Sequence, residues 1–475
     1  MLLKTNAFFS LALASLYTLL GVAQIDYNLK DFQTPDIHYR RLDANTSLSG
    51  NQNNFENSNS TVGVGTLSLD FYGYTNTDKY IGKQYGRANG GFRLLDNESE
   101  SPTGEVYKNK GGSSNYYLQG TAENRWYTNQ RDGGYFGLHG ALGYQGGMSK
   151  RELTGVSVDL LEENDESING QLYTAYGIGR IEPVTYARLA YDTYDWLRKK
   201  GRLSGSPSNE EIDELAATMI EVANTRFFDS RFKRIFQLEQ IDSTLRSSGL
   251  ISEADMVYFA QVADIWGYAN NFERGSGSLW EFGAVGDFAY EDYYYKRTEN
   301  DSVIRDEKVV GWNDLAVYGY ARYMNQKPIS VKWQRDYDVA LYVGTGGHFQ
   351  EIYNQDTDLN PNFRSTLKAG YQFGYYPNTR TYWTTRINGF VTYGENSDAS
   401  NEGNGYALEA RSQLYYWFTP RFRLSVNLRL VYSDNYVADS FIPLIDDSMV
   451  YDSSAGYNGK GFSTSLGASL SYALF

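Results

Sequence analysis

The feature of this 475-residue sequence that most constrains its fold is a repeated alternation of apolar and polar residues. In residues 421–432 (RFRLSVNLRLVY) one parity is apolar from Phe422 to Tyr432, and the other carries Arg421, Arg423 and Arg429. Successive side chains of a strand point to opposite faces, so the pattern predicts a strand with one apolar and one polar face. Twelve residues is long for a strand of a soluble protein. The same alternation recurs in residues 280–290, 315–323, 337–343, 363–375, 383–393 and 406–418.

The connections between these segments alternate in length. In the second half of the chain the short ones are 325–328, 377–380 and 419–420, and the long ones are 295–312, 347–362, 394–405 and 433–461. The first half offers six strand candidates at about 36–44, 61–74, 80–95, 114–127, 135–147 and 170–181, with long polar connections at 45–60, 96–113 and 148–169. Six and eight strands predict an antiparallel sheet of about fourteen, within a range of twelve to sixteen.

The first 23 residues have the pattern of a cleavable export signal. Lys4 gives a positive start, residues 7–20 are apolar, and Gly21, Val22 and Ala23 are small residues before the expected cleavage point. A retained anchor helix is the alternative, but the apolar stretch is short for a bilayer span of about 20 residues. We therefore expect residues 1–23 to be removed on export.

The mature chain resembles bacterial outer-membrane β-barrel proteins as a class. Its strands are long, short and long connections alternate, Tyr and Gly number 43 and 47, and the alternating segment 462–475 ends on Phe475. The resemblance implies a mainly β fold, an antiparallel transmembrane β-barrel in the outer membrane of a Gram-negative cell. It also implies contact with outer-membrane lipid and with the barrel-assembly machinery during biogenesis.

Residues 183–272 interrupt the strands, because the apolar period changes there from 2 to about 3.6. Four amphipathic helices are predicted, one ending at Gly201, one opened by a capping box of Ser208 and Glu211, one ending near Gly249, and one starting at Ser252 and Asp255. The insertion separates N-terminal barrel strands in 24–182 from C-terminal barrel strands in 273–475. Counting strands back from a periplasmic C-terminus places it in the periplasm or in the lumen as a plug.

Charged residues on the polar parity are candidates for the lining of the lumen. They are Arg364, Lys368, Arg386, Arg411, Arg421, Arg423, Arg429, Glu281, Asp287 and Glu409. A basic wall facing an acidic wall would set a transverse field across a pore and select polar solutes. The alternative is that these charges pair directly and fill a closed barrel.

Other classes of site have little support in the sequence. A net charge of −14 argues against a nucleic-acid partner, since phosphate binding needs a basic face. The three His residues complete no nucleophile–base set, and the oxygen-rich segment 354–360 lacks the Gly and the closing Glu of a calcium loop. We expect no enzyme activity, no cofactor and no metal.

Two functions of different classes remain open. The first is a pore or transporter for small polar solutes, with the helices as plug or gate. The second is a non-conducting barrel that anchors a periplasmic interaction module or serves as a subunit of an envelope complex. A basic cluster lies where the second and third helices meet: Arg226, Arg231, Lys233 and Arg234. It fits a solvated face; the alternative is that it docks an acidic periplasmic protein partner or the barrel's own acidic lumen.

Overall fold

A computed structural model gives the three-dimensional structure of the chain. It describes residues 25–472 except 56–57, 102, 104, 129–130, 155–158, 226–229, 269–272, 300–301, 352–361, 395–402 and 435–459. The expected export signal, the segment 354–360 and the terminal Phe475 lie outside the described residues.

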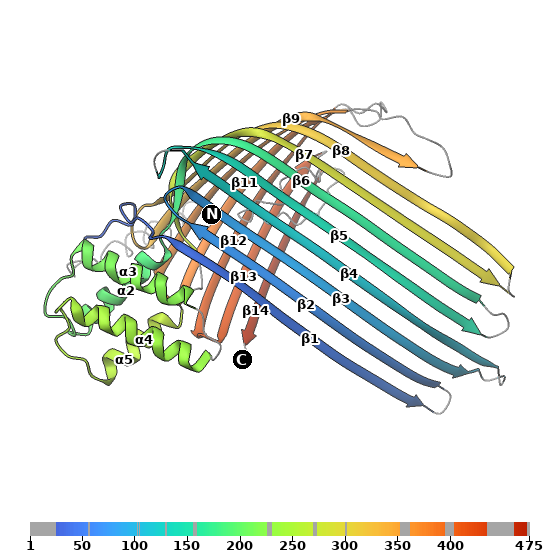
Figure 1. Cartoon of the computed structure of the whole chain (residues 1–475), viewed down its shortest axis with the longest axis horizontal. Helices are drawn as coiled ribbons and strands as arrows, with labels where there is room; N and C mark the ends of the chain where they lie inside the picture. The colour runs from blue at the N-terminus through green and yellow to red at the C-terminus, as the bar shows by residue number, and fades with distance from the viewer. Residues whose placement is uncertain are drawn as a thin grey trace, which may run out of the picture.

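Fourteen antiparallel strands form one sheet in which every strand pairs with its sequence neighbours. They are β1 Ile37–Phe55, β2 Ser58–Asn76, β3 Tyr80–Glu100, β4 Val106–Tyr127, β5 Gly134–Thr154, β6 Asp159–Pro183, β7 Gly275–Glu299, β8 Ser302–Pro328, β9 Trp333–Glu351, β10 Asn362–Asn378, β11 Thr381–Gly394, β12 Gly403–Thr419, β13 Phe422–Asp434 and β14 Gly461–Tyr472. The sheet curls so that β1–β9 form one wall and β10–β14 the wall behind it (Figure 1). The predicted fold class is confirmed.

The two edges of the sheet are β1 and β14. No pairing joins these two strands among the described residues, and most side chains of both strands are exposed. In the described part of the chain the sheet is therefore curved and not closed by pairing, with β1 and β14 as its two edges.

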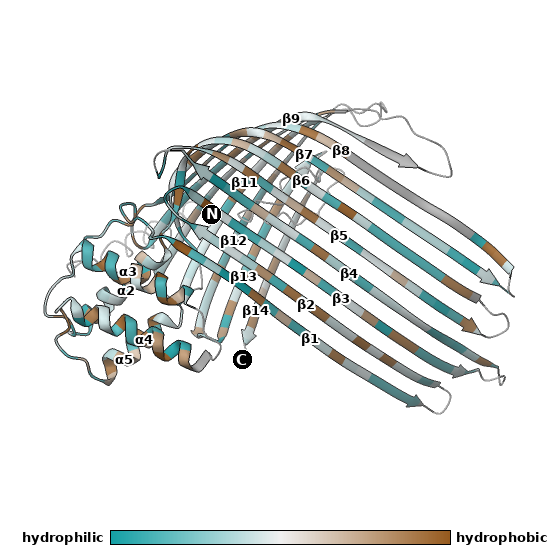
Figure 2. Ribbon diagram, viewed as in Figure 1, coloured by the Kyte–Doolittle hydropathy of each residue, from teal (hydrophilic) through white to brown (hydrophobic). Residues whose placement is uncertain are grey.

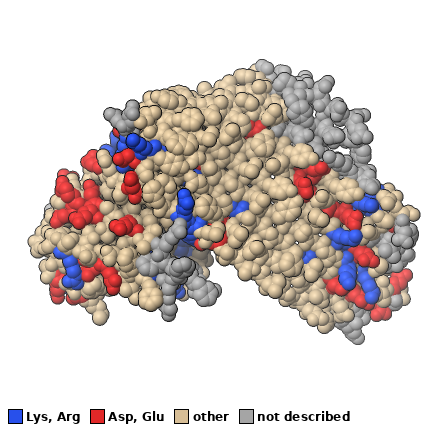
Figure 3. Space-filling model, in the orientation of Figure 1, with Lys and Arg blue, Asp and Glu red and all other residues tan. Residues whose placement is uncertain are grey.

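The outer face of the sheet is apolar at the depth where lipid is expected. Large apolar side chains such as Leu142, Leu172, Val317 and Leu408 are half exposed on it. Most charged side chains on the face shown in Figure 3 lie over the helices or at the opposite end of the long strands, with a broad, largely uncharged band between. Ring contacts join neighbouring strands near the helices: Trp126–Phe136, Trp280–Tyr323, Trp333–Tyr375 and Phe418–Phe422. An apolar belt bordered by aromatic rings is what a membrane selects.

The long polar connections predicted at 45–60, 96–113, 148–169 and 295–312 are wrong. Residues 45–55, 58–60, 96–100, 106–113, 148–154, 159–169, 295–299 and 302–312 belong to strands, and β1–β8 are 19–27 residues long. A membrane needs only about 9–11 residues per strand. Beyond the lipid both faces of a strand meet water, so polarity without alternation did not distinguish strand from loop there; Figure 2 shows these outer ends as mainly hydrophilic.

Four helices lie between β6 and β7 and form the helical module: α2 Thr185–Lys199, α3 Asn209–Asn224, α4 Ser230–Ser247 and α5 Met256–Trp266. The predicted capping box is present, since Ser208 accepts from the Glu211 backbone N–H and Glu211 accepts from that of Ser208. Gly201 follows α2 with a φ of 66°, as a left-handed helix end requires. The N-cap of α5 is Asp255 and not Ser252, because Asp255 accepts from the Tyr258 N–H at 3.0 Å.

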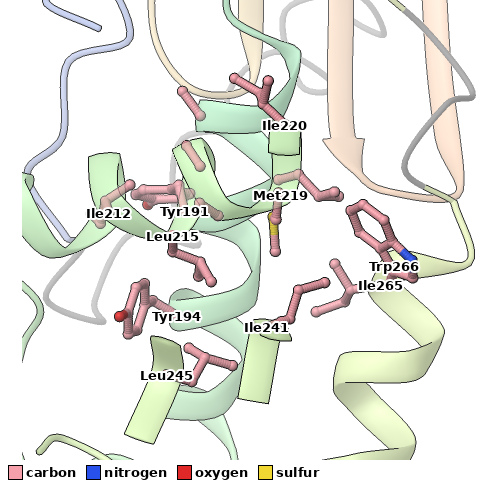
Figure 4. Close-up of a cluster of buried hydrophobic side chains, with 14 of the residues drawn as sticks. Tyr191, Tyr194, Ile212, Leu215, Met219, Ile220, Ile241, Leu245, Ile265 and Trp266 are labelled. Carbon is pink, nitrogen blue, oxygen red and sulfur yellow. The ribbon is translucent and has the colours of Figure 1, made fainter. Parts of the chain in front are cut away.

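The helical module has its own apolar core, to which α2, α3, α4 and α5 all contribute (Figure 4). Tyr191, Ile212, Leu215, Met219 and Ile241 are at most 1% exposed. The segment before β1 packs into the same core through Ile25, Leu29 and Phe32. The module and the start of β1 are thereby joined.

None of the helices in the described part of the chain is long and apolar enough to cross a membrane.

Candidate functional site: the inner wall and its helical cover

The predicted lumen residues of β10–β13 share the parity of the buried inner face. Phe390 and Asn388 beside Arg386, and Val431 beside Arg429, are at most 6% exposed, whereas Ile387 on the other parity is 45% exposed. The inner parity of these strands carries Arg364, Lys368, Arg386, Arg411, Arg423, Arg429 and Glu409. Arg421 is the exception: the hairpin turns at residues 420–421, so its side chain is exposed and lines no wall.

On the wall of β4–β8 the predicted acid Glu281 lies in a closed polar network. Its carboxylate accepts from the hydroxyls of Tyr135 at 2.9 Å and Tyr320 at 2.8 Å, and Arg125 lies 3.5 Å away. His139 Nε2 is 3.7 Å from the same carboxylate. Asp287, six residues further along β7 on the same parity, accepts from Gln171. A charge this deeply buried needs such partners, so this part of the wall fits the structural alternative.

Direct pairing also occurs on the wall of β8–β13. Asp338 lies 3.1 Å from Arg322 and 4.0 Å from Lys368, and Arg429 Nε donates to Glu409 at 2.7 Å. Arg423 stacks over the rings of Tyr415 and Trp417 and forms no ion pair among the described residues. Basic side chains nevertheless outnumber acidic ones on the described inner face of β10–β13.

The helical module covers one end of the sheet, called here the helical end (Figure 1). The connections at this end join β2 to β3, β4 to β5, β8 to β9, β10 to β11 and β12 to β13. Contacts from the module reach several of them, so the module is attached across the mouth and not at one point.

Two buried arginines make the main attachment. Arg274, just before β7, donates to Gln334 Oε1 at 2.8 Å and to the carbonyls of Ser330, Val331 and Trp333 around the β8–β9 connection. Arg188 of α2 donates to the carbonyl of Asn378 at 2.9 Å in the β10–β11 connection. Both guanidinium groups lie near the ring of Tyr376.

Burial governs the charges at this junction. It lowers the pKa of Arg274 to about 9, helped by repulsion from Arg188, and it lowers the pKa of Arg188. Asp192, 3.1 Å from Arg188, has its pKa raised by the same burial. Two cations and one anion held out of water are costly to separate from the carbonyl groups and the opposite charge that they contact.

A second attachment joins the end of α5 to the same β10–β11 connection and to one further connection, β12–β13. Asp264 forms an ion pair with Arg380 between β10 and β11, with an Nη2–Oδ1 distance of 2.6 Å. The same guanidinium lies over the ring of the buried Tyr268. Gly267 lies against Pro420 of the β12–β13 connection, where an added Cβ would be 3.2 Å from the proline ring.

A third group of contacts ties the start of the chain to the same end. Arg131 pairs with Glu182 at 2.7 Å and with Asp78, and it donates to the carbonyl of Thr34. Arg180 donates to Asn76 and to the carbonyl of Thr77. The rim at β1–β6 is thus fixed by arginines as the rim at β8–β13 is.

The predicted docking cluster is only partly described. Arg226 lies outside the described residues, as does the side chain of Arg231. Lys233 is half-buried and Arg234 exposed on α4, and Arg234 donates to the carbonyl of Ala263 at 3.4 Å. Lys233 and Arg234 thus lie on the surface of the module, beside α5.

Sequence reasoning missed the residues of the main attachment. One weak signal was present: Arg188 and Asp192 stand four residues apart on α2, a spacing that places opposite charges side by side on a helix. They lie on the face opposite the predicted apolar stripe, so the sequence did not indicate that this face is buried. Nothing in the sequence indicated Arg274, whose partners are carbonyl groups far along the chain.

No family model matches this chain, and no curated protein sequence matches it. Among solved structures, the chain is similar to the translocator domain of the autotransporter NalP from Neisseria meningitidis, with 10% identity and a TM-score of 0.27 over 87% of this chain and 95% of that one. The β domain of the Bordetella autotransporter BrkA shows 9% identity and a TM-score of 0.28 over 74% and 93%. CdiB from Acinetobacter baumannii shows 8% identity and a TM-score of 0.24 over 92% and 59%. The likeness to these outer-membrane barrels is one of fold.

Proposed function

We propose that the protein is a gated pore for small polar solutes in the outer membrane, closed at its periplasmic mouth by the helical module. The observation that carries the proposal is the attachment of one compact module to several connections of the mouth through Arg188, Arg274 and the Asp264–Arg380 pair. A plug must be held at more than one point to block a mouth, and charged contacts can be released without exposing a large apolar surface.

The polar inner wall supports a conducting interior. Arg386, Arg411 and Arg429 are neither fully buried nor exposed, which fits side chains that border a solvent-filled space. Water and charge along the path are what a small polar solute needs.

Conductance of the full chain in planar bilayers tests this proposal. We expect the unaltered protein to be mostly closed, and Arg188→Met with Arg274→Met to conduct in a large fraction of the recording time. Arg246→Met, which changes an exposed arginine of α4, is the matched control and should behave as the unaltered protein. Silence of every variant, together with silence after deletion of residues 184–270, would show that the barrel is not a pore.

A second candidate function, anchoring of a periplasmic interaction module, is favoured by one observation. Within the described part of the module, the exposed large apolar side chains are Trp196 on α2 and, on α4 and α5, Phe232, Ile235, Met256, Val257 and Phe259. A helix that is apolar on all sides is normally buried, and α5 is exposed on one side. Its face beside Lys233 and Arg234 suits an acidic amphipathic segment of a periplasmic protein.

Peptide binding to the full chain distinguishes this candidate. Two amphipathic helical peptides with the same apolar face, one with Glu and one with Lys on the polar face, serve as probes. Preference for the Glu peptide, lost in Phe259→Ser and kept in Trp196→Ser, would favour the anchoring function. Equal and weak binding of both peptides would remove it.

A further inference from the structure

Three arginines of the inner wall lie side by side across three neighbouring strands. Arg386 of β11 is directly opposite Arg411 of β12, and Arg411 is directly opposite Arg429 of β13. Directly opposed residues of an antiparallel pair have Cβ atoms about 4.5–5.5 Å apart. These residues, called here the arginine row, therefore present three guanidinium groups at one level of the wall.

One acid of the inner parity pairs directly with the row: Glu409 accepts from Arg429 Nε at 2.7 Å. Asn388 lies between Arg386 and Glu409, accepting from Arg386 Nε at 3.0 Å and donating to Glu409 at 3.5 Å. On the next strand Gln372 is opposite Arg386 and donates to Asp336. Glu409 is the one acid on the inner parity of β11–β13 in the described part of the wall.

Like charges directly opposite one another destabilise a sheet. Elsewhere on this chain opposed or neighbouring charges are mostly of opposite sign, as in Lys150–Glu162 and Arg87–Asp70. An arrangement that costs stability and faces the interior is expected where a ligand uses it. Guanidinium groups bind planar or tetrahedral oxyanions through paired N–H donors, so the ligand that fits has negatively charged oxygen atoms.

We propose that the arginine row is a binding site for a small oxyanion, a carboxylate or phosphate group, on the wall of the lumen. This deepens the proposed function, because it assigns the solute class of the pore and rests on the interior being open to solutes. The site would concentrate anions within the lumen and exclude cations of the same size.

Equilibrium binding to the full chain in detergent tests the site, with inorganic phosphate and acetate as separate probes and chloride as the reference anion. Arg411→Gln removes the central member of the row and keeps its length. We expect roughly 10- to 100-fold weaker binding of the better probe in this variant, since one hydrogen-bonded charge is lost. Arg364→Gln, which removes an inner cation of β10 outside the row, should bind as the unaltered protein does.

A stability measurement gives an independent readout. In buffer without oxyanions, Arg411→Gln should have a higher Tm than the unaltered protein, because the central like charge is gone. The preferred oxyanion should raise the Tm of the unaltered protein and leave that of the variant nearly unchanged. Equal oxyanion affinity in the two proteins, or a variant with a lower Tm under both conditions, would overturn the site.

Failure of the site and failure of the pore are separate results. Oxyanion binding at the row without conductance from any variant would keep the site and remove the pore. Conductance with equal permeability for chloride and potassium, and without loss of oxyanion binding in Arg411→Gln, would keep the pore and remove the site.

Discussion

At the residue scale, Arg274 is the group on which the junction depends most. Arg274 is 2% exposed, and its guanidinium donates to Gln334 and to the backbone carbonyls of three residues around the β8–β9 connection. We expect Arg274→Met to weaken attachment of the module by about 3 kcal/mol, since buried acceptors lose a charged donor. Hydrogen exchange of the β8–β9 connection measures this. Arg246→Met, an exposed i,i+4 partner of Asp242, should cost about 0.5 kcal/mol at most.

Asp255 makes the stability of the module sensitive to acid. The hydrogen bond and charge of Arg202, together with the Tyr258 N–H, hold the pKa of Asp255 below its ordinary value. A carboxylate with a lowered folded-state pKa contributes stability above its unfolded-state pKa of about 3.9, and that contribution is lost as the pH falls through the folded-state pKa. We therefore expect helix content to fall in that range. Circular dichroism of Asp255→Asn should show this acid-dependent part missing; identical pH profiles for the two proteins would exclude Asp255 as its source.

At the scale of elements, the helical module and the sheet have separate sources of stability. Leu215 of α3 is fully buried in the apolar core to which all four helices contribute. We expect Leu215→Ala to destabilise the module by about 2–5 kcal/mol, the cost of a cavity in a packed core. The helical signal should then melt at lower temperature while the sheet signal is unchanged. Loss of both signals together would mean that the sheet requires the folded module.

The strands β9–β13 and the helices α2 and α3 could be predicted from the sequence because apolar residues recur in them with the period of a strand or a helix. Residues 421–432 alternate with the two-residue period of a strand, and the apolar stripe of α2 follows the period of a helix. The outer parts of β1–β8 could not be predicted, since a strand in water on both faces needs no alternation. The turn at Arg421 was missed because Arg421 continues the polar parity of β13 by one residue into the hairpin.

The inner wall was predictable in composition and not in arrangement. Alternation assigns Arg386, Arg411 and Arg429 to one face. Their alignment into one row depends on the registers of β11, β12 and β13, which a sequence does not state. The attachment through Arg274 depends in the same way on connections brought together only by the closed end of the fold.

At the scale of the whole molecule, the proposed gated pore combines a sheet that crosses the membrane, a basic inner wall and a helical module fixed at the mouth. The chain has no Cys, so an introduced pair of thiols can report on the cover without interference. Asp264 and Arg380 form the ion pair of the α5 attachment, so cysteines at these two positions can be joined by a reversible cross-link.

The most direct test of the gating claim is single-channel recording of the full chain with Asp264→Cys and Arg380→Cys. The side chain of Arg380 spans the distance to Asp264, whereas a direct disulfide needs Cβ atoms about 3.8 Å apart, so a short reducible bis-methanethiosulfonate reagent is used to join the two thiols. We predict no current while the cross-link is present, and current after a reducing agent cleaves it and a voltage step displaces the module. Each single-cysteine variant, treated with the same reagent, is the control and should respond to voltage with or without reductant. The same steady current in the cross-linked and reduced states of the double variant would contradict the claim that the helical module closes the pore.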